Sequence, residues 1–259
     1  MIRSKFGLIG IGWDVRGWQS DKQHIAVAQL EPGLDNINWL GISEPFKFNA
    51  GPMPPLLDLL IPAIGSTLAI EIAKVNSMTL AIDAPLAFPK KLTALLNNTN
   101  ANHSRVPERA IDNPYGYRDC ERWVHEQYNK RAGSATFDQM GNLATLAMSV
   151  SQNLTKEGFS LIPQQSTQSH RSIIEVYPAL VKTDFLRNSP AIAEIDQLIP
   201  NELEYGSDEY DSAICAVMAL LFQGAESQLN LPSLITKPAG LDSLEGWIYC
   251  LPRDDLKNS

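Results

Sequence analysis

Short runs of apolar residues recur along this chain, and glycine, proline or polar residues bound most of them. Runs of about four to eight such residues are typical of buried strands. The pattern predicts strands at 5–14, 24–30, 37–43, 77–85, 171–180 and 245–252. Because short polar turns join the first three strands, we expect them to form an antiparallel meander.

Longer segments place their apolar residues at helical spacing instead. They predict helices at 56–74, 118–131, 137–158 and 208–224. The first of these should break at Pro62 or Gly65, and the last ends at Gly224. Because a helix precedes the 77–85 strand, we expect a crossover that adds this strand to the sheet in the parallel sense.

Together these elements predict one α/β domain over residues 1–259. Its sheet should be mixed, with three antiparallel strands followed by parallel strands, and with helices on both faces. Residues at about 90–160 interrupt the strand pattern with polar and helical sequence. They predict a helical insertion within the domain.

Composition excludes some classes of protein. Apolar residues at 44% and charged residues at 19% are ordinary for a globular chain. A formal net charge of −8 argues against a strongly basic nucleic-acid coat, although it permits a nuclease, whose catalytic carboxylates are themselves acidic. The three cysteines form no CxxC pair, which favours a reducing, cytoplasmic setting. No stretch reaches the roughly 18 apolar residues of a membrane span, so we expect no membrane partner.

Acidic residues stand at the ends of predicted core elements. Asp14 ends the run LIGIGWD, Asp83 ends the strand in IDAPLAFP, and Glu175 interrupts SIIEVYP. Asp208 and Asp211 are three residues apart at the start of the last helix, so their side chains share one helical face. These five residues are the candidate catalytic carboxylates.

Each acid also has an ordinary structural explanation. Acids at strand ends often serve as turn or cap residues, and acids in a first helical turn are favoured by the helix dipole. Glu175 could instead form an ion pair with His170 or Arg171, which precede its strand. Taken singly, none of the acids requires a functional role.

As a set, the acids predict a metal site. If the strands that end in Asp14 and Asp83 are neighbours, their carboxylates converge and repel each other unless cations neutralise them. Hard oxygen ligands select Mg²⁺ or Mn²⁺. Two such ions could clamp the attacking and leaving oxygens of a phosphodiester, which points to nucleic acid or a nucleotide as substrate.

The order of elements resembles the ribonuclease H-like fold: a strand with Asp, a meander, a helix, a second strand with an acid, and a late helix that opens with Asp. Five segments are similar to blocks of the family called domain of unknown function 429, and they span nearly the whole chain: GIGWDVRGW, AIDAPLAFP, YRDCERWV, IIEVYPAL and DEYDSAICAVMAL. That family is predicted to contain ribonuclease H-like nucleases. The D-x-x-D-x-A pattern on the last helix is also similar to the closing motif of Holliday-junction resolvases.

This resemblance implies that Asp14, Asp83 and Asp211 are the metal ligands, with Asp208 and Glu175 as further catalytic carboxylates. The chain has Ser212 where the pattern leads us to expect alanine after the aspartate. That departure leaves the prediction of a helix intact.

Three arginines are candidates for substrate binding. Arg118 and Arg122 lie four residues apart on one face of a predicted helix and could meet phosphates. Arg171 lies just before the Glu175 strand and could also contact substrate. The alternative for Arg118 and Arg122 is a solvated face of mixed charge, because acidic residues are interleaved with them, and the alternative for Arg171 is plain surface placement.

Glycines at 7, 10, 12 and 17 crowd the first strand. Their spacing matches neither the dinucleotide-binding nor the P-loop fingerprint, so close packing of the strand explains them better than a phosphate loop.

The sequence therefore predicts a metal-dependent phosphodiester hydrolase. Two alternatives stay open. One is a non-catalytic binding protein that keeps the sheet without the chemistry. The other is a nucleotide phosphotransferase of a related fold, although such proteins normally have two duplicated halves and this chain has one.

Overall fold

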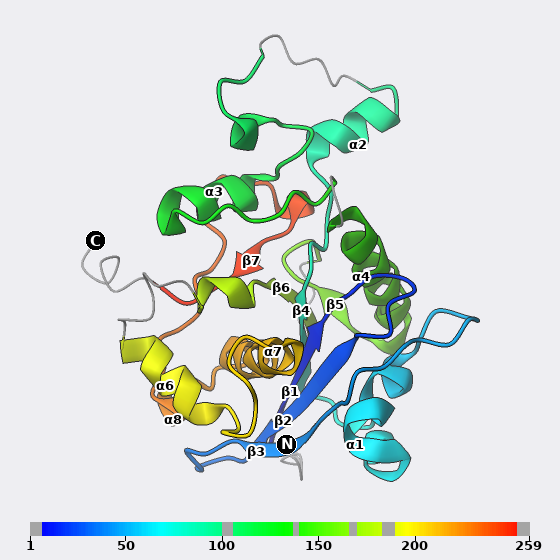
Figure 1. Ribbon diagram of the computed structural model, residues 1–259, viewed down its shortest axis with the longest axis vertical. Coiled ribbons are helices and arrows are strands. Elements are labelled where there is room, and N and C mark those ends of the chain that lie inside the picture. The colour runs from blue at the N-terminus through cyan, green and yellow to red at the C-terminus, as the bar shows by residue number, and fades with distance from the viewer. Residues whose placement is uncertain (1–6, 100–105, 137–139, 166–169, 183–189, 253–259) are drawn as a thin grey trace.

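The computed structural model describes residues 7–99, 106–136, 140–165, 170–182 and 190–252 (Figure 1). The first three predicted residues of the 137–158 helix lie outside these ranges. No helix in the described ranges is long and apolar enough to cross a membrane.

A seven-stranded mixed sheet forms the centre of the protein, in the order β3-β2-β1-β4-β6-β5, with β7 also paired to β6. The strands are β1 Leu8–Asp14, β2 His24–Leu30, β3 Asn38–Ile42, β4 Met78–Asp83, β5 Ser160–Leu161, β6 Arg171–Val176 and β7 Ile248–Tyr249. The first three pair antiparallel, and β4 and β6 add in parallel. The predicted meander and parallel additions are therefore confirmed. The two-residue β5 has no apolar run long enough to predict it.

Helices cover both faces of the sheet, as predicted. In Figure 1, α7 lies against one face, while α1 and α4 lie on the other; α2 and α3 lie beyond the end of β4. Their bounds are α1 Leu56–Ile72, α2 Lys90–Leu96, α3 Asp119–Tyr128, α4 Met140–Leu154, α6 Pro190–Leu198, α7 Asp208–Phe222 and α8 Glu226–Leu229. The predicted break in α1 falls at Gly65, whose φ of 69° is left-handed.

Successive side chains along each central strand point to opposite faces of the sheet, so each strand packs against the helices on both faces. In β1, Ile9, Ile11 and Trp13 belong to the buried cluster with α1 and α4. The residues between them, Gly10 and Gly12, face α7 instead. The layer between the sheet and α7 is thus thin, because one of its walls carries no side chain at these positions.

Gly10 and Gly12 set how closely α7 approaches β1. A Cβ added at Gly12 would lie 2.0 Å from the carbonyl oxygen of Ser212, and one added at Gly10 would lie 2.4 Å from that of Ala216. Both clashes are with helix backbone, which cannot rotate away as a side chain can. The interpretation of these two glycines as close-packing residues is therefore confirmed.

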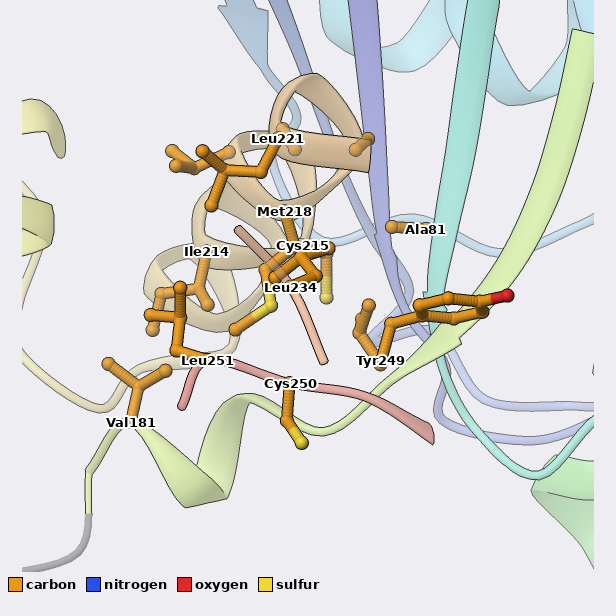
Figure 2. Close-up of a cluster of buried hydrophobic side chains, with 14 of the residues drawn as sticks. Ala81, Val181, Ile214, Cys215, Met218, Leu221, Leu234, Tyr249, Cys250 and Leu251 are labelled. Atoms are coloured by element: carbon orange, nitrogen blue, oxygen red, sulfur yellow. The ribbon is translucent and has the colours of Figure 1, made fainter. Parts of the chain in front are cut away.

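A large apolar cluster surrounds α7, both on the side toward the sheet and beyond it (Figure 2). Ile214, Cys215, Met218 and Leu221 of α7 lie there with Ala81 of β4, Val181, and the 249–251 segment. Because α7 is buried along almost its whole length, its position relative to β1 and β4 is fixed by packing on all sides. This rigid placement determines where its first turn meets the sheet.

Candidate metal centre

The ends of β1 and β4 lie side by side. The strands pair in parallel with Asp14 opposite Asp83 as their last matched residues. Residues matched in this way point to the same face of a sheet. Because Gly12 and Ala81, two residues earlier, face α7, both aspartates project toward that helix.

The first turn of α7 supplies a third carboxylate. Ser207 caps the helix, and its Oγ accepts a hydrogen bond from the backbone N–H of Tyr210 at 3.1 Å. One residue further on, Asp211 projects back toward the sheet, where it is 7% exposed. The close approach of α7 to Gly12 thus brings Asp211 to the ends of the two strands.

One oxygen from each of Asp14, Asp83 and Asp211 lies within 4.8 Å of the other two. Hard cations bind carboxylate oxygens at about 2.0–2.6 Å. Two oxygens on opposite sides of one cation are therefore separated by about twice that distance, which the separation in this group matches. Asp14 Oδ2 and Asp211 Oδ1 are buried and have no hydrogen-bond partner among the described residues. Because buried polar atoms are nearly always satisfied, these two oxygens and the set of hard donors fit a divalent cation.

Two basic side chains flank the acids. Arg16 Nε lies 2.9 Å from Asp14 Oδ2, in an ion pair whose geometry does not make a hydrogen bond, and Arg16 also pairs with Asp208. On the other side, Lys182 Nζ donates to Asp211 Oδ2 at 2.6 Å. When all are ionised, Asp14, Asp83, Asp208 and Asp211 carry four negative charges, and Arg16 and Lys182 carry two positive charges. Two negative charges therefore remain. One divalent cation would neutralise them.

Burial and mutual repulsion perturb the aspartates. Burial raises the pKa of Asp14 to about 8, and the Asp83 carboxylate adds to the rise while Arg16 opposes it. Burial also raises the pKa of Asp83 to about 7, with Asp211 adding to the rise. The pKa of Asp211 is raised by burial as well, and Lys182 limits that rise. Such shifts on clustered carboxylates are common at functional sites.

These shifts predict how stability depends on pH. The folded protein holds protons on Asp14 and Asp83 up to about pH 7–8, whereas the unfolded chain releases them near the ordinary value of 3.8. Stability should therefore fall as pH rises from about 4 to about 8 in a chelator, and the two shifts correspond to a fall of roughly 6 kcal/mol between pH 5 and pH 8. Urea unfolding at several pH values measures this fall, and an Asp14→Asn variant should flatten it. A free energy of unfolding that rises over the same range would contradict the placement of these acids.

Glu175 lies outside the group of three aspartates. In the β4–β6 ladder it is matched with Ile82, one residue short of Asp83, so it points to the opposite face of the sheet. Its two oxygens accept hydrogen bonds from Arg118 at 2.6 and 2.8 Å, and one also accepts from the backbone N–H of Leu86 at 2.9 Å. Glu175 therefore has an ion pair, as the alternative for it anticipated, but with Arg118 and not with its neighbours in sequence.

The three candidate arginines have structural contacts. Arg118 is fully buried, and it also bonds Glu121 and the carbonyl of Glu245. Arg122 pairs with Asp119 and donates to the carbonyl of Tyr117. Arg171 donates to three backbone carbonyls, those of Ala73, Val75 and Glu157. A role in substrate binding stays a prediction for these residues, and their contacts account for each position without it.

Asp208 lies beside the group rather than within it. Its carboxylate is partly exposed and holds Arg16. Sequence patterns did not identify Arg16 or Lys182. Arg16 follows Asp14 by two residues, and this spacing could have identified it as a partner of that acid. Lys182 is distant from Asp211 in sequence, and only the fold brings the two together.

Comparisons with protein-family models, with curated proteins and with solved structures each found no match. The resemblance to domain of unknown function 429 therefore stays a prediction.

Proposed function

We propose that this protein is a divalent-metal-dependent phosphodiester hydrolase of ribonuclease H-like fold, in which Asp14, Asp83 and Asp211 hold Mg²⁺ or Mn²⁺. One observation carries the proposal. One oxygen from each of three carboxylates in distant parts of the chain lies within 4.8 Å of the other two, and two buried oxygens of these residues accept no hydrogen bond within the described part of the chain. A carboxylate that only capped a turn would have its oxygens satisfied by backbone N–H groups.

The arrangement of elements supports the assignment to this fold. The first acid ends β1, the first strand of the meander, the second ends its parallel neighbour β4, and the third lies in the first turn of a late helix that covers both strands. This is the order in which the acids occur in the sequence pattern described above. The site thus lies where the carboxyl ends of two parallel strands meet a helix N-terminus, a common position for ligands of α/β proteins.

In the proposed mechanism the aspartates bind the metal ion and Arg16 reduces the repulsion between carboxylates. When bound, a divalent cation supplies Lewis acidity, which favours ionisation of water at neutral pH and offsets charge on the leaving oxygen. Asp14 and Asp211 would each offer as a ligand a buried oxygen that accepts no hydrogen bond among the described residues, and Asp83 would complete the set. Arg16 limits the repulsion between Asp14 and Asp208. No protein nucleophile is required, and all three cysteines of the chain are buried.

A phosphodiester suits this site for electrostatic reasons. The negative charge of a phosphodiester is spread over oxygens that hard cations bind well. The proposed substrate is therefore nucleic acid or a nucleotide. The net charge of −8 and the clustered aspartates repel a polyanion, and a bound cation would reduce that repulsion at the site.

Cleavage of labelled oligonucleotides tests the proposal. Single- and double-stranded DNA and RNA should be incubated with the protein in Mg²⁺, in Mn²⁺ and in a chelator. We expect cleavage of at least one substrate with either metal and none in the chelator. Binding of an oligonucleotide without cleavage in either metal would favour the non-catalytic binding protein.

A further inference from the structure

Lys182 is held at the metal centre by the apolar core. It follows the short 3₁₀ helix Pro178–Leu180 and directly follows Val181. Figure 2 shows Val181 among the buried side chains that surround α7, and it is 2% exposed. This anchor directs the next side chain to the first turn of α7, where Lys182 Nζ lies 2.6 Å from Asp211 Oδ2.

The ammonium group has capacity for a second contact. A lysine carries three N–H donors, and within the described part of the chain Asp211 is the hydrogen-bond partner of Lys182 Nζ. The side chain is 22% exposed, so part of it faces solvent at the edge of the site. On Asp211, Lys182 occupies Oδ2 and leaves Oδ1 unpartnered. The lysine and a cation could therefore share this carboxylate.

A stabilising role toward α7 alone does not explain the lysine. The N-terminal turn of a helix carries partial positive charge, which favours acids and disfavours cations. A positive group in contact with a ligand would also weaken the binding of a metal ion. In the metal-free site the carboxylate of Asp211 offsets both effects. Once a cation neutralises that carboxylate, a bound anion would be needed to offset them.

The net charge of the metal-loaded site gives a reason for a lysine at this position. With Lys182 and Arg16 included, the four carboxylates keep two negative charges, which a divalent cation cancels. Without Lys182, the loaded site would keep one negative charge and repel a phosphodiester. With it, the loaded site is neutral and offers an ammonium donor next to the aspartates.

We propose that Lys182 contacts the phosphate of the substrate, and so is a substrate-binding residue. This inference deepens the proposed hydrolase function and depends on it. The proposal assigns to Lys182 the role that sequence patterns had suggested for Arg118, Arg122 and Arg171.

Lys182→Met removes the charge at nearly constant length, and Lys182→Arg keeps the charge. Lys74→Met is the matched control, because Lys74 lies on the surface before the start of β4, at the end of the sheet opposite to Asp83. Two quantities should be measured for each variant: the affinity for Mn²⁺ alone, and the affinity of the Mn²⁺-loaded protein for inorganic phosphate by ³¹P relaxation.

We expect Lys182→Met to bind Mn²⁺ at least as tightly as the wild type and to bind phosphate about tenfold more weakly. Lys182→Arg should keep most of the phosphate affinity, and Lys74→Met should match the wild type. With an oligonucleotide, the loss in Lys182→Met should fall mainly on KM.

Two results would overturn the inference alone. One is a phosphate affinity unchanged in Lys182→Met, and the other is a loss of Mn²⁺ binding, which would make Lys182 a support for Asp211. If the wild type binds no Mn²⁺, the proposed function fails as well. Circular dichroism checks the folding of each variant, and Lys182→Gln replaces Lys182→Met if the latter does not fold.

Discussion

Replacing Asp83 by asparagine should reduce metal-dependent phosphodiester cleavage by about a hundredfold or more. The change keeps the shape of the side chain and removes one of the charges that hold the cation. We expect millimolar Mn²⁺ to stabilise the wild type, by about 2.7 kcal/mol at a concentration of 100 times Kd, and this stabilisation should largely disappear in the variant. Thermal unfolding with and without Mn²⁺, alongside the cleavage assay, measures both effects.

Without metal, the Asp83→Asn substitution should raise the stability of the folded protein. Because burial and Asp211 raise the pKa of Asp83 to about 7, removing its charge relieves repulsion at pH 8. We expect the metal-free variant to be more stable than the wild type at this pH, by up to about 4 kcal/mol. Asp35→Asn, at an exposed position, is the matched control and should change neither property. A metal-free Asp83→Asn protein that is less stable than the wild type would indicate a structural acid instead of a ligand.

Replacing Arg118 by methionine should have the largest effect on stability. Arg118 is fully buried and pairs with Glu121 and Glu175, at 2.9 and 2.6 Å. Removing the guanidinium leaves two buried carboxylates without their cation, which costs about 3–5 kcal/mol. Urea unfolding at pH 7 measures the loss. Since Glu175 also accepts from the N–H of Leu86, three residues after Asp83, the variant should bind Mn²⁺ less tightly too.

Arg109→Met provides the comparison for this loss. Arg109 pairs with Asp112 at 2.7 Å on the surface, and exposed pairs of this kind contribute about 0–1 kcal/mol. A second comparison combines Arg118→Met with Glu175→Gln, which removes one unpaired charge and should recover part of the stability. Equal losses in Arg118→Met and Arg109→Met would show that the buried network contributes little.

Several features of the fold follow from local pattern. Apolar runs with sharp turn signals predict β1, β2 and β4, because a buried strand in a central position has few alternatives. Gly10 and Gly12 predict close packing, and the position of α7 explains what packs there. Position at the ends of predicted elements makes Asp14, Asp83, Asp208 and Asp211 candidates, and the resemblance to domain of unknown function 429 implies that Asp14, Asp83 and Asp211 are the ligands.

Other features depend on register and tertiary contact, which local pattern does not contain. Glu175 ends an apolar run much as Asp83 does, but the ladder matches it with Ile82 and so turns it to the other face. A shift of one residue would reverse that result. Lys182 lies 29 residues before Asp211 and reaches it only because Val181 is buried beneath α7. The sequence predicts that Arg118 binds substrate, with a solvated face of mixed charge as the alternative. Its burial reflects the three glutamate-bearing segments that surround it.

A crystal structure of the protein soaked in Mn²⁺ tests the central claim most directly. Anomalous scattering locates the ion without reference to any substrate. We predict a peak bonded to oxygens of Asp14, Asp83 and Asp211, with Lys182 still on the second oxygen of Asp211. A map with no anomalous peak among these carboxylates at millimolar Mn²⁺, and with Arg16 and Lys182 alone neutralising them, would contradict the account.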